Sequence, residues 1–145
     1  MKKFIVILIA AISIVACNQR TEKSAGEKPV SAVEDSANFT TIQWMEDSLN
    51  LGTVKEGAVV DVSFRFKNTG DKPLIISNVS AGCGCTVPET PKEPFQPGQE
   101  GKIEAKFNSK NFPGHNHKTV TVLANTKGTT SHLLSFEVNV EKENN

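Results

Sequence analysis

Two cysteines separated by a single glycine, Cys83-Gly84-Cys85, are the residues of this chain best suited to chemistry. Thiolates bind soft metal ions and take part in disulfide exchange. In an extended strand, residues two apart have Cα atoms about 6.6 Å apart and parallel side chains, whereas a disulfide requires Cβ atoms about 3.8 Å apart. A bond between the two cysteines therefore needs a kink in the backbone, and Gly84 permits one.

Three interpretations of the cysteine pair stay open. The thiols are idle and packed at the edge of a sheet, or they form a labile disulfide that serves as a redox handle, or they hold copper or zinc. Two sulfurs on one tetrahedral metal centre lie about 3.8 Å apart, which suits parallel side chains. His115 and His117 are also two apart and would add nitrogen ligands if residues 108–116 form a loop at the same end of the domain.

The rest of the sequence predicts a protein that is not an enzyme. No nucleophile lies in a strand-turn-helix elbow, no glycine-rich loop opens a helix, and no carboxylate pair is set on facing strands. The 16 basic residues are matched by 16 acidic ones, without a basic stripe interleaved with aromatic residues. This balance argues against nucleic acid as a partner.

The first sixteen residues have the pattern of a signal peptide. Lys2 and Lys3 precede an uncharged, apolar run of 13 residues, 4–16. A helix that spans a membrane requires about 20 residues, so this run is too short to be an anchor helix. We therefore predict that residues 1–16 direct export and are removed.

The run ends in Ile14-Val15-Ala16-Cys17, which resembles the lipobox of bacterial lipoproteins. This resemblance implies that the Cys17 thiol receives diacylglycerol and often a further acyl chain such as palmitate. Two or more chains hold a protein stably on a membrane, whereas one holds it only marginally. Asn18 follows the cysteine in place of Asp, which by resemblance to a known sorting rule favours the outer membrane.

Residues 17–38 are predicted to form a tether between the lipidated cysteine and the domain. The stretch is polar and charged with no apolar periodicity, so it cannot bury enough surface to offset the entropy of ordering. Two tripeptides, Asp35-Ser36-Ala37 and Asp47-Ser48-Leu49, resemble a short bacterial O-glycosylation motif. They mark Ser36 and Ser48 as candidate glycosylation sites.

Residues 39–141 are predicted to form one all-β domain, followed by a tail at 142–145. Val62, Phe64 and Phe66 alternate with polar residues, as expected for a strand with one buried face. Seven to eight such strands, separated by turns rich in Gly, Pro and Asn, predict an immunoglobulin-like antiparallel β-sandwich. The predicted strands cover residues 40–45, 51–54, 60–67, 73–76, 83–87, 101–107, 118–124 and 132–140.

Two connections are predicted in more detail. The turn at Asn68-Thr69-Gly70-Asp71 is expected to join the strands on either side of it into a hairpin. Four prolines crowd residues 88–97, so this segment cannot be a central strand and is expected to cross between the sheets.

The chain resembles the exported bacterial domains known as domain of unknown function 1573 (DUF1573). The resemblance rests on motifs spread over residues 51–114: Leu51-Gly52-Thr53-Val54, Gly57, Phe64 to Gly70, Cys83-Gly84-Cys85-Thr86, Pro97-Gly98, Gly101 and Gly114. It implies an immunoglobulin-like sandwich and export, and it brings no activity. We therefore expect a lipid-anchored binding or assembly module whose partner is another envelope protein, with metal binding or thiol-disulfide chemistry as the alternative.

Overall fold

The computed structural model describes residues 36–142. The predictions for the signal peptide, for Cys17 and for most of the tether lie outside these residues. A short 3-10 helix, η2 (Ser36–Asn38), is followed by eight strands. They are β1 (Ile42–Trp44), β2 (Ser48–Lys55), β3 (Val59–Asn68), β4 (Ile76–Ala81), β5 (Thr86–Pro88), β6 (Glu100–Asn108), β7 (Gly114–Ala124) and β8 (Ser131–Glu141).

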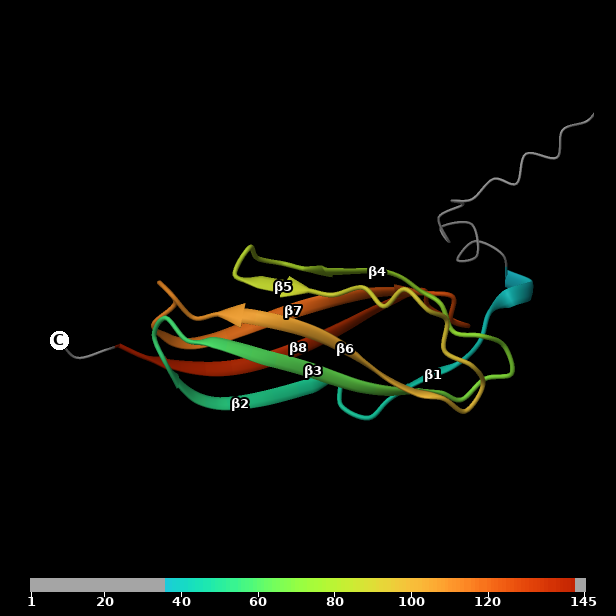
Figure 1. Ribbon diagram of the computed structural model, residues 1–145, viewed down its shortest axis with the longest axis horizontal. Helices are drawn as coiled ribbons and strands as arrows, with labels where there is room; N and C mark the ends of the chain where they lie inside the picture. The colour runs from blue at the N-terminus through green and yellow to red at the C-terminus, as the bar shows by residue number, and fades with distance from the viewer. Residues whose placement is uncertain (1–35, 143–145) are drawn as a thin grey trace, which may run out of the picture.

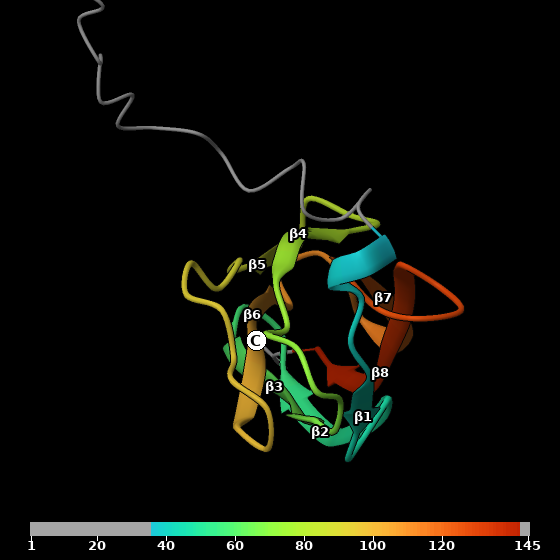
Figure 2. The same ribbon diagram turned by 90° about the vertical axis from the view of Figure 1, so that its right-hand side faces the viewer.

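The strands form two four-stranded sheets packed face to face. One sheet has the order β1-β3-β6-β5 and the other β2-β8-β7-β4. Viewed from the side of η2, the sheets curve around a shared core (Figure 2). The predicted all-β, immunoglobulin-like sandwich is confirmed. It departs from a purely antiparallel arrangement in one pair, because β2 runs parallel to β8.

The core consists of side chains that point inward from both sheets. β3 shows the expected alternation, with Val62, Phe64 and Phe66 at most 1% exposed and the residues between them exposed. Phe107 of β6 and Phe136 of β8 meet edge to face across the two sheets, with ring centroids 5.6 Å apart. Burial of these apolar side chains, at roughly 25 cal/mol per Å², drives the two sheets together.

The hairpin predicted at residues 68–71 is wrong. β3 pairs with β1 and β6, whereas β4 pairs with β7 in the other sheet. Asn68 does not lie in a turn but ends β3, fully buried, and its side-chain amide donates to the backbone oxygens of Lys72 and Phe95. These bonds hold the backbone at residues 72 and 95 beside the end of β3, and the chain then continues into the opposite sheet as β4.

The proline-rich segment also behaves differently from the prediction. Residues 89–99 join β5 to β6, which are antiparallel neighbours in the same sheet. The chain instead crosses between sheets at residues 82–85, where it passes from the edge strand β4 to the edge strand β5. The segment that contains both cysteines is therefore a link between the two layers.

The sandwich has two ends that differ in chemistry. One end, which we call the amide end, carries η2 and the loops around Asn68 and Asn125. The other, the disulfide end, carries residues 82–85 and the loop 109–113 between β6 and β7. Figure 1 shows η2 at one end of the long axis and the β4–β5 turn toward the other. The last residue of β8 reaches the disulfide end.

Candidate disulfide site

Cys83 and Cys85 are joined by a disulfide bond. Their Cα atoms are 5.3 Å apart, closer than the spacing of an extended strand, because residues 82–85 turn. The strand predicted from residue 83 begins only at Thr86, so the cysteines precede it. The backbone N–H of Thr86 donates to the Cys83 carbonyl at 3.4 Å, which closes the turn. Of the three interpretations of the pair, the structure contains the disulfide.

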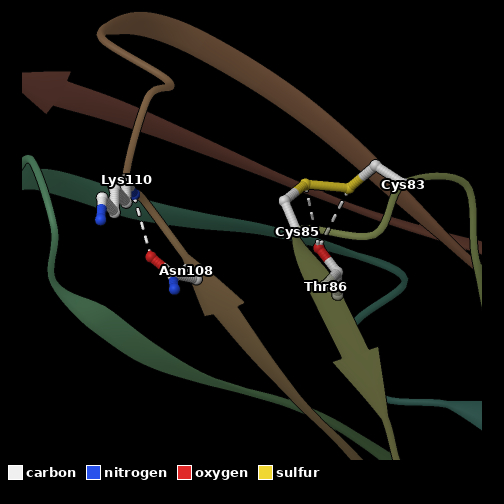
Figure 3. Close-up of a disulfide and its surroundings, with 5 residues drawn as sticks. All are labelled: Cys83, Cys85, Thr86, Asn108 and Lys110. Carbon is white, nitrogen blue, oxygen red and sulfur yellow. Dashed lines mark hydrogen bonds between the residues drawn. A yellow bond between two sulfur atoms is a disulfide. The ribbon is translucent and has the colours of Figure 1, made fainter.

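The side chain of Thr86 lies directly beneath the bond. Its hydroxyl oxygen is 3.6 Å from the Cys83 sulfur and 3.9 Å from the Cys85 sulfur (Figure 3). Thr86 is only 4% exposed and stands opposite Phe107 of β6. The backbone N–H of Asn108 holds the turn from the other side by donating to the Cys85 carbonyl at 2.8 Å. The disulfide therefore lies against the buried hydroxyl of the first residue of β5.

The two cysteines differ in exposure. Cys85 is 9% exposed and belongs to the hydrophobic core, whereas Cys83 is half-buried and packs at the margin of that core. Gly84, between them, is exposed, and a Cβ built there would meet no atom within 4 Å. The outer side of the turn is thus open, and solvent reaches it at Cys83 more readily than at Cys85.

Two hollows flank the disulfide, one on each side of the turn. The first is lined by Gly82, Cys83, His117, Lys118 and Thr119. The second is lined by Gly84, Cys85, Asn108, Lys110, Asn111 and Phe112. Lysine supplies the charge in each hollow, and neither hollow is lined by a carboxylate. The site is therefore suited to a negatively charged group, including a thiolate.

Phe112 fixes the loop that forms the second hollow. Its ring packs 6.2 Å from that of Phe107, and the Lys118 ammonium lies 4.4 Å from its centroid. The buried Asn116 side chain donates to the Phe112 carbonyl at 2.7 Å. The loop 109–113 is thus tied to β7 and to the core, which makes the second hollow a formed feature.

The two histidines do not lie in a loop, as the metal interpretation assumed, but on the exposed face of β7. His117 lines the hollow at Cys83, whereas His115 stands opposite Asn139 of β8. Within residues 36–142, no group of three or more His, Cys, Asp or Glu side chains is placed to hold a metal ion. With both sulfurs bonded to each other, copper or zinc binding stays a prediction about the reduced protein.

Neither candidate glycosylation site lines the hollows beside the disulfide. Ser48 begins β2 and is exposed, and the Ser135 hydroxyl lies 3.3 Å from its own. Ser36 is the first residue of η2, at the amide end. Glycosylation of either residue stays a prediction, as does lipidation of Cys17, which falls outside the described residues.

Sequence reasoning missed the residues that surround the cysteines. Thr86 appeared only as part of the DUF1573 motif, and Lys110, Phe112 and Lys118 were not singled out. They come from β5, from the loop after β6 and from β7, and the strand order brings them together. The periodicity of a strand does not reveal which distant strand end will lie beside it.

The disulfide contributes little to stability. It closes a loop of only three residues, Cys83 to Cys85. On the chain-entropy model such a loop is worth about 1.6 kcal/mol, against about 3 kcal/mol for a loop of 15 residues. A cross-link of this kind holds the shape of the turn, and it does not tie distant parts of the fold together.

The family model of DUF1573, described as a protein of unknown function, matches residues 42–140. This chain belongs to the DUF1573 family. The match covers all eight strands apart from the last residue of β8, so the described sandwich is the family's domain. No curated protein matches the chain.

Solved structures with the same architecture come from varied proteins. A protein of unknown function from Porphyromonas gingivalis superposes with a TM-score of 0.61 at 11% identity over 72% of this chain, which spans 49% of that protein. The PapD-like domain 7 of human CEP192 gives 0.55 at 12% identity, covering 87% and 99%. The Escherichia coli chaperone DraB gives 0.51 at 12% identity, covering 70% and 56%. At these identities the likeness establishes the fold alone.

Within the described residues, no helix is long and apolar enough to cross a membrane.

Proposed function

We propose that this chain is an exported, lipid-anchored, non-enzymatic module that binds another protein of the bacterial cell envelope. The observation that carries the proposal is the placement of the ends of the sandwich. η2, where the described chain begins, lies at the amide end (Figure 1), and the two hollows are lined by residues of the disulfide turn and its neighbours toward the other end.

On this proposal the anchor and the binding surface belong to opposite ends of the sandwich. Cys17 would carry the lipid on the outer membrane, and the predicted tether would join the sandwich at the amide end. The disulfide end would then be the end remote from the attachment point. Immunoglobulin-like domains commonly present the loops at one end to their partners, and a lipid confines the contact to the membrane surface.

The chemistry of the disulfide end indicates what kind of surface it fits. Lys110, His117 and the half-buried Lys118 line the hollows without a carboxylate among the lining residues. A partner with acidic side chains at the contact would be favoured by charge complementarity, mainly through a faster association. We therefore propose an acidic patch on the partner.

Site-specific photo-crosslinking in intact cells tests this proposal. A photoreactive amino acid replaces Lys110 at the disulfide end or, as a matched control, Lys127, which is also exposed and lies in a loop at the amide end. We expect a discrete protein adduct from position 110 and none from position 127. Equal adducts from both positions, or an adduct from position 127 alone, would contradict the proposal.

The anchor is tested separately by metabolic labelling with palmitate. The unaltered chain should take up the label and sediment with the outer membrane, and Cys17→Ala should do neither. If both chains fractionate alike and neither is labelled, the anchor is wrong. Crosslinking from position 110 in the Cys17→Ala chain then reports on the binding surface by itself.

A further inference from the structure

We propose that the Cys83–Cys85 disulfide is a thiol-disulfide exchange site that accepts electrons from a dithiol protein, with attack on Cys83. The proposal goes beyond the binding role and needs neither the lipid nor the acidic partner. The two bonded sulfurs lie in a turn that is exposed at Gly84, and on the chain-entropy model a bond that closes so short a loop contributes little stability to the fold. Its reduction would therefore leave the sandwich intact.

The difference in exposure selects the sulfur that is attacked. Cys83 is half-buried and lines the hollow formed with β7, whereas Cys85 is a core residue. An incoming thiolate must approach the sulfur that it attacks, so access decides between the two. Lys118 lines the same hollow as Cys83, with its ammonium over the Phe112 ring, and its positive charge favours the approach of a thiolate to this end of the sandwich.

The exchange is a two-electron step. The partner thiolate bonds to the Cys83 sulfur as the bond between Cys83 and Cys85 breaks, and the electron pair leaves on Cys85, which takes up a proton. The second cysteine of the partner, as its thiolate, then attacks the partner's first sulfur, which is the one bonded to Cys83 in the mixed disulfide. Cys83 leaves as a thiolate and is protonated. The partner ends as a disulfide and the chain as a dithiol.

Thr86 is the residue placed to assist this step. Its hydroxyl is 3.6 Å and 3.9 Å from the two sulfurs, so it can donate to whichever becomes a thiolate. Lys110 also lines the hollow beside Cys85, but its side chain points away from the disulfide (Figure 3), which leaves the Thr86 hydroxyl as the group nearest to the sulfurs. Because a hydrogen bond to a charged group is worth more than one to a neutral group, the hydroxyl stabilises the cleaved state over the disulfide.

The test is a trapping experiment on the full chain in detergent. The probe is a thioredoxin-type protein that retains its attacking cysteine and lacks the second, so the reaction stops at the mixed disulfide. Mass spectrometry of the cysteine-containing peptide then shows which sulfur carries the partner. We expect the adduct on Cys83. An adduct on Cys85, or no adduct under conditions where a small phosphine reduces the bond, would overturn the proposal.

The role of Thr86 is tested by the rate of reduction with the intact dithiol protein. Thr86→Val keeps the shape of the side chain and removes the hydroxyl, and Thr86→Ser keeps the hydroxyl. We expect reduction of Thr86→Val to be about tenfold slower, and Thr86→Ser to react like the unaltered chain. A melting temperature measured for each variant in the oxidised form controls for loss of structure. Equal rates for Thr86→Val and the unaltered chain would remove Thr86 from the mechanism.

Discussion

The two ends of the sandwich are cross-linked in opposite ways. At the amide end, two buried side-chain amides bind loops that are far apart in the sequence. Asn68 accepts from the Thr40 hydroxyl at 2.9 Å, and Asn125 donates to the Asn38 carbonyl at 2.8 Å. At the disulfide end, a covalent bond joins residues only two apart.

The strength of a single bond is therefore a poor guide to what holds this fold together. The bonds of Asn68 and Asn125 span as many as 87 residues and satisfy two side-chain amides that are themselves fully buried. Loss of either side chain removes several of these bonds at once. The disulfide spans a turn whose ends are already close, so its loss frees little chain. The noncovalent end is thus the structural one, and the covalent end is available for chemistry.

The largest effect is expected from Asn68→Ala. The substitution removes the bonds from the Asn68 amide to the carbonyls of Lys72 and Phe95 and leaves the buried Thr40 hydroxyl without its acceptor, although the Phe95 carbonyl still accepts from the backbone N–H of Leu74. We expect the free energy of unfolding to fall by at least about 3 kcal/mol in urea titrations. Asn139→Ala, at an exposed position of β8, is the control and should change it by less than about 0.5 kcal/mol. Similar effects for both variants would mean that the amide end is not a structural cross-link.

Reduction of the disulfide is expected to have a smaller effect. The free energy of unfolding of the reduced chain should lie within about 1.6 kcal/mol of that of the oxidised chain, since only a three-residue loop is released. Urea titrations with and without reductant measure the difference without changing either side chain. A reduced chain that unfolds at ambient temperature would reverse the contrast between the two ends.

The smallest effect is a pH dependence at the amide end. His132 is half-buried against Trp44, with its Nε2 atom 2.7 Å from the Thr126 hydroxyl, and burial lowers its pKa. The unfolded chain then binds the proton more readily than the folded one. Stability is therefore full above about pH 6.5 and falls as the pH drops below it. Because the ring is partly exposed, we expect a loss below about 1 kcal/mol between pH 7.5 and 5.5.

His132→Gln is the matched variant for this measurement, because glutamine can bond to Thr126 and does not titrate. Its free energy of unfolding should change less over the same pH interval. The ion pair of Arg65 and Glu46 does not interfere with this measurement. The Arg65 guanidinium lowers the pKa of the Glu46 carboxyl, so the stability that this pair contributes is lost only below the interval from pH 7.5 to 5.5. An equal slope between pH 7.5 and 5.5 in both chains would assign the pH dependence to other groups.

Much of the fold could be predicted from single strands, and little of the connections between them. β3 was predicted because apolar and polar residues alternate along it, and this alternation shows which face of the strand is buried. The hairpin after it was wrong because Asn68-Thr69-Gly70-Asp71 has the composition of a turn, whereas the Asn68 amide forms hydrogen bonds inside the protein. β7 was predicted to start at Lys118 and begins at Gly114, so His115 and His117 moved from a loop to a strand.

The sequence by itself determined the all-β class, the family, and the pair of cysteines with a glycine that lets the chain turn between them. Those features are local, because they depend on periodicity and on residues adjacent in the chain. Only the tertiary structure decided that the cysteines are bonded, that Thr86 lies beneath them, and that lysines from two other segments flank them. These features depend on which strand ends meet, and that is decided by the packing of the two sheets around a common core.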